Sequence, residues 1–128
     1  MPNTDSCSRS LRRTVFACAV LPAGVLAHHS LAIYDLQTQI PFEGTVDRLW
    51  FRNPHIEMTI KSVGPQGNET IIHFIEGPPA NTLARQGLTP AQLKKGTKIT
   101  VIGSPLIADN TKLFVRSIIL ENGREFRN

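Results

Sequence analysis

The stretch HIEMTIK, residues 55–61, decides the fold because apolar side chains recur there at every second position. That period belongs to a β-strand with one buried face and one polar face. The polar face carries His55 and Glu57 side by side. The sequence therefore predicts a half-buried strand here, with chemistry-bearing residues at its start.

Further strand signals surround this stretch. Ile40 to Phe51 is rich in apolar and β-branched residues, its internal Gly44 indicates a bulge or bend, and Asn53-Pro54 ends it. Residues 64–68 predict a turn, and Asn122-Gly123 predicts a tight turn. The remaining predictions are strands over 70–76, 98–103 and 112–121, a loop over 105–110 and a short strand over 124–126.

The period changes between the third and fourth strands. Leu83, Leu88 and Leu93 stand there among Ala, Arg, Gln and Lys. Asn81 and Thr89 are candidate N-caps, and Pro90 suits the first position of a helix. One or two short helices are expected.

Five strands with a helix between the third and fourth predict a mainly β fold, a small five-stranded OB-like Greek-key barrel. An open sheet or sandwich with the helix on one edge also fits the periodicity. The expected core comprises Ile56, Met58, Ile60, Val101, Val115 and Ile119.

The first 27 residues have the three parts of a cleavable secretory signal. Arg9, Arg12 and Arg13 precede an apolar run, and small residues lead to cleavage after Ala27. The run is shorter than the roughly 20 residues of a membrane span. Residues 28–128 are then expected as one periplasmic or secreted domain that meets the membrane only during export, by the general or the twin-arginine route.

Charge gives no basis for nucleic-acid binding. Of 14 basic and 10 acidic residues, three arginines and Asp5 lie within the signal, which leaves 11 basic and 9 acidic. The charges are scattered. Both cysteines, Cys7 and Cys18, also lie in the signal, so the processed chain has no disulfide or thiolate chemistry.

All four histidines follow the signal: His28, His29, His55 and His73. A terminal His28 could chelate a metal through its amine and imidazole, and a third nitrogen from His55 or His73 would suit Cu(II). Leu31, Ile33 and Tyr34 could anchor that terminus on the sheet. In the alternative interpretation, His28 and His29 are only a polar beginning of the processed chain. His55 then caps a turn, and His73 is a hydrogen-bonded core residue.

No motif for hydrolase, phosphate-loop or metalloprotease chemistry occurs. Trp50, Phe51, Arg52 and Glu57 form a candidate surface for a ligand or partner, with at least one of the two aromatics buried. Glu57 and Glu76 could be polar-face neighbours across adjacent strands. The carboxylates of Asp35, Glu43 and Asp47 are expected in solvent.

The sequence resembles a family of small bacterial exported proteins of unknown function. The resemblance lies in the opening His-His-Ser at 28–30, in Asn53-Pro54-His55, in Glu76, and in short glycine-containing motifs at 43–46, 83–87, 93–96 and 101–105. It implies that His28, His29 and His55 belong to a family pattern. Phe51, His73 and Leu88 stand where the family tends to have tryptophan.

These observations favour an exported, non-catalytic binding module for an envelope partner or a small ligand. The alternative is a Cu(II)-binding or metal-handling protein built on His28. A second alternative is an enzyme whose reaction the sequence does not indicate.

Overall fold

The computed structural model describes residues 31–127, so the predicted signal and its cleavage point lie outside the described residues. The elements in chain order are η1 (Leu31–Ile33), β1 (Ile40–Trp50), β2 (Glu57–Val63), β3 (Glu69–Glu76), α1 (Ala80–Arg85), η2 (Pro90–Leu93), β4 (Lys98–Leu106), β5 (Asp109–Leu120) and β6 (Glu125–Arg127). None of the helices among these residues has the length and apolar character needed to cross a bilayer.

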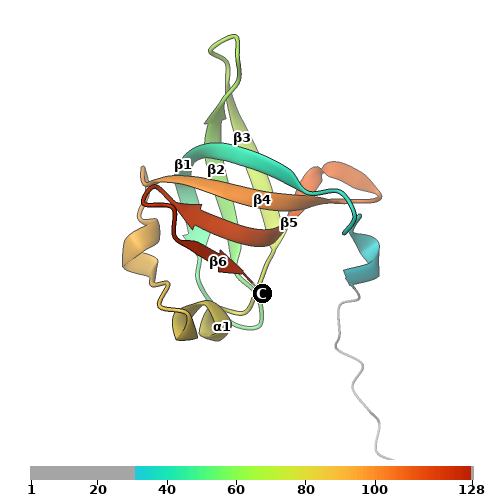
Figure 1. Ribbon diagram of the computed structural model, residues 1–128. Helices are drawn as coiled ribbons and strands as arrows, with labels where there is room; N and C mark the ends of the chain where they lie inside the picture. The colour runs from blue at the N-terminus through green and yellow to red at the C-terminus, as the bar shows by residue number, and fades with distance from the viewer. Residues whose placement is uncertain (1–30, 128) are drawn as a thin grey trace, which may run out of the picture.

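The strands form a closed barrel (Figure 1). Neighbours run β3-β2-β1-β4-β5-β6, and β3 also pairs with β5 in parallel, which closes strands β1 to β5 into the barrel and leaves β6 paired with β5 alone. This order is that of an OB-like Greek key. The predicted barrel is confirmed, and the β3–β5 pairing excludes the open sheet.

Gly44 marks a bend in β1 where the strand changes partners. Residues 40–45 pair with β4, and residues 45–50 pair with β2. A Cβ atom on Gly44 would overlap the carbonyl oxygen of Lys61, so only glycine allows this close approach. The bulge itself lies at Asp47, between the paired residues Val46 and Arg48.

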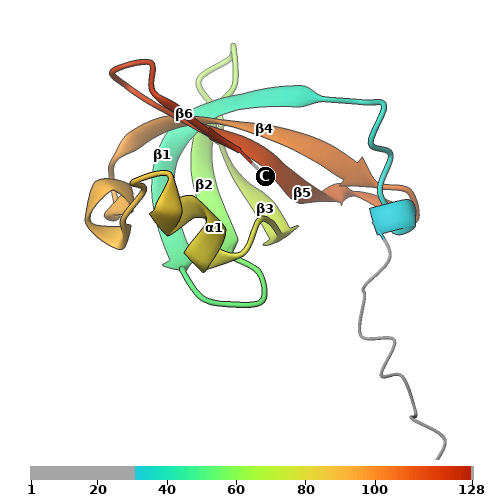
Figure 2. The same cartoon turned by 60° about the horizontal axis from the view of Figure 1, so that its bottom comes forward.

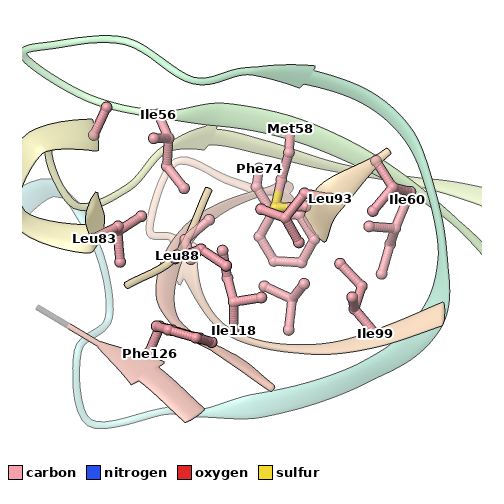
Figure 3. Packing of buried hydrophobic residues seen from close by; sticks show 14 of the residues in the cluster. Ile56, Met58, Ile60, Phe74, Leu83, Leu88, Leu93, Ile99, Ile118 and Phe126 are labelled. Atoms are coloured by element: carbon pink, nitrogen blue, oxygen red, sulfur yellow. The ribbon is translucent and has the colours of Figure 1, made fainter. Parts of the chain in front are cut away.

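The core fills the barrel interior with side chains from β1 to β6 and the helical segments (Figure 3). Five of the six predicted core residues are buried. The exception is Ile119, which is only half-buried, and its neighbour Ile118 (0% exposed) lies in the core instead. The pairings Ile102 with Ser117 and Gly103 with Val115 leave Arg116 as an extra residue in β5. This irregularity shifts the alternation by one residue, so the prediction of Ile119 was wrong.

The segment between β3 and β4 contains both expected short helices, and α1 lies across one end of the barrel (Figure 2). Thr89 caps η2, its N–H donates to Gln92 Oε1, and Pro90 is the first helical residue, as predicted. Asn81 is not a cap, because α1 already begins at Ala80.

The predicted loop over 105–110 was wrong. β4 continues to Leu106 and β5 begins at Asp109, so only two residues form the turn. Pro105 is accommodated next to a register shift, where its missing N–H disturbs the ladder little. The predicted short terminal strand is confirmed as β6.

Candidate functional site

Two chain connections lie side by side at the end of the barrel near α1, namely residues 51–56 after β1 and residues 77–79 after β3. The Ile56 N–H donates to the Pro78 carbonyl at 3.1 Å, and the Asn81 N–H donates to Asn53 Oδ1 at 3.2 Å. A Cβ atom on Gly77 would lie 2.9 Å from both Ile56 and Val115. The glycine therefore lets the two connections pack closely.

This packing orients His55. Its Nδ1 lies 2.9 Å from the Gly77 carbonyl oxygen, which can only accept, so Nδ1 carries the hydrogen. Nε2 lies 3.4 Å from Glu76 Oε1. The ring is thus fixed with Nε2 turned toward a carboxylate, while its side chain stays 34% exposed.

Glu76 is the last residue of β3, and its alternation places it on the inner side of the strand. Phe74 and Glu76 are buried, and Ile75 between them is 40% exposed. Glu76 Oε2 accepts a hydrogen bond from the Tyr34 hydroxyl at 3.0 Å. Oε1 is also buried but accepts no hydrogen bond from any residue within 31–127.

Tyr34 fixes the beginning of the described chain to this carboxylate. Its backbone forms a bridge with Leu106, and its ring lies 5.3 Å from that of Phe114. Burial raises the pKa of the Tyr34 hydroxyl above its usual value, and the hydrogen bond to Glu76 and the charge of Glu76 raise it further. The hydroxyl therefore remains a donor at neutral pH. Of the three predicted anchors, Tyr34 is buried, whereas Ile33 is 48% exposed and Leu31 is half-buried.

His55 and Glu76 border an open pocket, here named the His55 pocket. Within it the Arg52 guanidinium binds Glu57 Oε1 at 2.8 Å. The predicted neighbours Glu57 and Glu76 thus share the pocket, but the prediction that both lie on the polar face was wrong for Glu76. Glu76 is buried on the inner side of β3, whereas Glu57 is accessible and paired with Arg52. The lining residues are Arg52, Asn53, Pro54, His55, Glu57, Ile75 and Glu76.

The predicted surface of Trp50, Phe51, Arg52 and Glu57 is present in part. Trp50 is 41% exposed and pairs with Glu57 in the sheet. Phe51 instead packs against the core. Trp50, Arg52 and Glu57 therefore form an accessible surface at the edge of the His55 pocket. The expectation that one of the two aromatics is buried was wrong, because Phe51 is only partly buried where it packs against the core.

The predicted histidines are not all brought together. His73 lies on β3 next to buried Phe74 but is itself exposed, so the interpretation as a core histidine was wrong. It pairs with Thr59 and Lys112 rather than lining the His55 pocket. His28 and His29 lie outside the described residues. Within 31–127, no three His, Cys, Asp or Glu side chains gather as a metal centre.

Comparison with known protein families gives a match over residues 15–113, to a family of unknown function designated DUF6152. The chain belongs to this family. Neither the curated proteins nor the solved structures gave a significant match. Membership in a family of unknown function agrees with the resemblance seen in the sequence, while export and the histidine motifs remain predictions.

The buried role of Glu76 was not predicted, although the sequence contains a signal for it. Glu76 has the same strand parity as Phe74, and a carboxylate on the buried face of a strand requires a partner. Tyr34 was predicted as an apolar anchor, but its hydrogen bond spans 42 residues and has no local sequence signal.

Proposed function

We propose that this protein is an exported binding module whose ligand is a copper ion, Cu(II), held at the His55 pocket by His55 together with the amine and imidazole of a processed His28 terminus. The single observation that supports this is the anchoring of Tyr34 on the carboxylate that contacts His55. The start of the described chain is thereby tied to the pocket.

The chain before η1 sets how far the terminus extends. His28 lies three positions before Leu31, the first residue of the 3-10 helix η1, and an extended chain spans at most about 3.3–3.6 Å per residue, so His28 extends up to about 10 Å from Leu31. The Tyr34 hydroxyl is already one carboxylate away from His55. His73, exposed on β3 three residues before Glu76, is a less direct partner.

The donor set suits Cu(II). Imidazole and amine nitrogens bind this ion well, and Cu(II) heads the divalent affinity order. The Nδ1–H of His55 donates to the Gly77 backbone carbonyl, and metal-binding histidines commonly donate their other ring N–H to a carbonyl in this way. Because the nitrogens must lose their protons to bind, we expect affinity to fall as the pH is lowered toward 5.

Calorimetric titration with Cu(II) tests the proposal on protein that starts at His28. We expect one tight site that loses most of its affinity when one residue is added before His28, and also in His55→Ala. His73→Ala is the matched control and should bind as the parent does. Equal binding by native and extended termini, or a silent His55→Ala, would overturn the proposal.

The exposed surface beside the pocket favours a second candidate, a module for an envelope partner or organic ligand. Trp50 and Ile75 are about equally exposed, at 41% and 40%, next to the cationic Arg52. OB-like barrels bind through this β2–β3 face and the loop between β1 and β2.

Trp50 is the only tryptophan in the chain, so its fluorescence reports directly on this surface. Titration with a candidate partner should change the emission of the parent and of His55→Ala alike, and binding should weaken in Arg52→Ala. Val63→Ala, which truncates an exposed side chain elsewhere on β2, is the control. Unchanged emission at saturation would reject this surface for that partner.

A further inference from the structure

Glu76 Oε1 is a buried oxygen that accepts no hydrogen bond from residues 31–127. The residue is 9% exposed, and only Oε2 accepts a hydrogen bond within residues 31–127. Burying a carboxylate oxygen is unfavourable unless a donor or a cation replaces the hydration that it loses. The geometry therefore points to a cation at Oε1.

The position of His55 indicates which kind of cation fits. Since Nδ1 donates to Gly77, a neutral His55 has its lone pair on Nε2, the atom 3.4 Å from Glu76 Oε1. Nitrogen and oxygen ligands lie about 2.0–2.2 Å from a metal ion, and the tetragonal geometry that Cu(II) prefers sets adjacent ligands at about 90°, so two such atoms are ~2.8–3.1 Å apart. His55 Nε2 and Glu76 Oε1 are 3.4 Å apart, so the partly exposed His55 ring has to move only slightly toward the carboxylate for both atoms to bind one ion.

Sulfur ligands are missing from the surroundings of this pair. Met58 is the only methionine within residues 31–127, and it is 1% exposed in the core. Soft sulfur ligands favour Cu(I), whereas carboxylate oxygen favours harder divalent ions. A site made of imidazole nitrogen and carboxylate oxygen therefore discriminates between the two oxidation states.

We propose that Glu76 Oε1 and His55 Nε2 are adjacent ligands of the bound ion and that Glu76 makes the site selective for Cu(II) over Cu(I). This inference rests on the proposed copper-binding function. Tyr34 is a positioning residue: its hydroxyl holds Oε2, which leaves Oε1 as the oxygen turned toward His55.

Three variants of the protein with a native His28 terminus test the assignment: Glu76→Gln, Tyr34→Phe and Glu57→Gln. Glu57 is the matched control, since it lines the same pocket but is paired with Arg52. Affinities for Cu(II) and for Cu(I) are measured separately by competition with chelators. Frozen-solution EPR of the Cu(II) forms reports on the ligand atoms.

Glu76→Gln should weaken Cu(II) binding by about 10–100-fold, the range found when residues around a metal are altered. Its Cu(I) affinity should stay unchanged. The reduction potential of the bound ion then rises by about 59 mV for each tenfold loss. The EPR parameters should change as an oxygen ligand is lost, and Glu57→Gln should match the parent in every measurement.

Tyr34→Phe should weaken Cu(II) binding by about three- to tenfold, the scale of one hydrogen bond. Its EPR spectrum should retain the parent ligand atoms but gain a second component, because the two carboxylate oxygens can then exchange. A loss of stability alone would leave a single parent spectrum, and that result would overturn the positioning role.

Parent-like Cu(II) affinity and EPR parameters in Glu76→Gln would overturn the assignment of Glu76. The proposed function would still stand if the one-residue extension abolished binding, and it would fail if the extension were silent. If Glu76→Gln does not fold, pulsed EPR of the Cu(II)-bound parent protein with ¹³C-labelled glutamate carboxylates tests whether Glu76 is a ligand. A strong copper coupling to ¹³C that persists in Glu57→Gln supports the assignment, and its absence overturns it.

Discussion

Asp47 and Glu76 have nearly equal side-chain exposure, 14% and 12%, but their neighbours differ in charge. Asp47 lies 3.3 Å from Lys95 Nζ, 3.8 Å from Arg48 Nε and 3.3 Å from the Thr59 hydroxyl. Glu76 meets one hydroxyl and one imidazole. Two carboxylates buried to the same degree are thus stabilised in different ways.

The charge of the neighbouring groups distinguishes Asp47, a structural carboxylate, from Glu76, a candidate ligand. The hydrogen bond from Lys95 is the main cause that lowers the pKa of Asp47 below its usual range, with smaller contributions from the charge of Lys95, Thr59 and Arg48. Its charge is already compensated within the fold. Glu76 has no permanent cation of the chain within ion-pair distance in residues 31–127, and an added ion can supply one.

The largest expected effect on stability comes from a substitution in the barrel core. Ile60 is 0% exposed and pairs with Val46 on one side and Ile72 on the other. Ile60→Ala should lower the free energy of unfolding by about 2–5 kcal/mol, because it leaves a cavity in a packed interior. Denaturant unfolding measures this. A loss no greater than that of exposed Val63→Ala would contradict the observed packing.

Much of this core could be predicted from local pattern. The alternation in residues 55–61 and the Thr89-Pro90 start of η2 agree with the fold because neighbouring residues alone determine them. Ile119 was misplaced because the irregularity at Arg116 arises from pairing with β4, which no local period reveals. Asp47, expected in solvent, is largely covered because the bulge in β1 brings it to Thr59 and Lys95.

The candidate site was predictable in part for the same reason. His55 was selected from residue type and position, and the structure places it partly exposed with Nε2 directed toward Glu76. Its partner Glu76 comes from β3, and Tyr34 comes from a segment before the barrel, so only tertiary structure joins them. Sequence could therefore propose the donors but not their arrangement.

Truncation of the two carboxylates tests the comparison directly, with a smaller effect than the core variant. Glu76→Ala leaves the buried Tyr34 hydroxyl without its acceptor and should cost about 1–3 kcal/mol. Asp47→Ala should cost less, because Lys95 is 76% exposed and water replaces the lost partner. Thermal and denaturant unfolding of the metal-free proteins compare them. Equal losses of stability in the two variants would mean that burial alone, and not the charge of the neighbours, determines how much each carboxylate contributes to the free energy of unfolding.

The smallest expected effect concerns acid unfolding and again separates the two acids. Because the pKa of Asp47 is lower in the folded protein than in the unfolded chain, the unfolded chain binds more protons as the pH falls below about 4. The stabilisation by Asp47 is complete above that pH and is lost as the pH falls through the folded pKa. Asp47→Asn should therefore make the acid limb of the stability curve shallower.

Asp35 and Asp109, whose pKa values are also lowered, should keep part of the slope. High salt should shrink the difference, since Lys95 is exposed to screening ions. An acid limb unchanged by Asp47→Asn at low salt would show that Lys95 does not compensate the charge of Asp47, and the distinction from Glu76 would then fail.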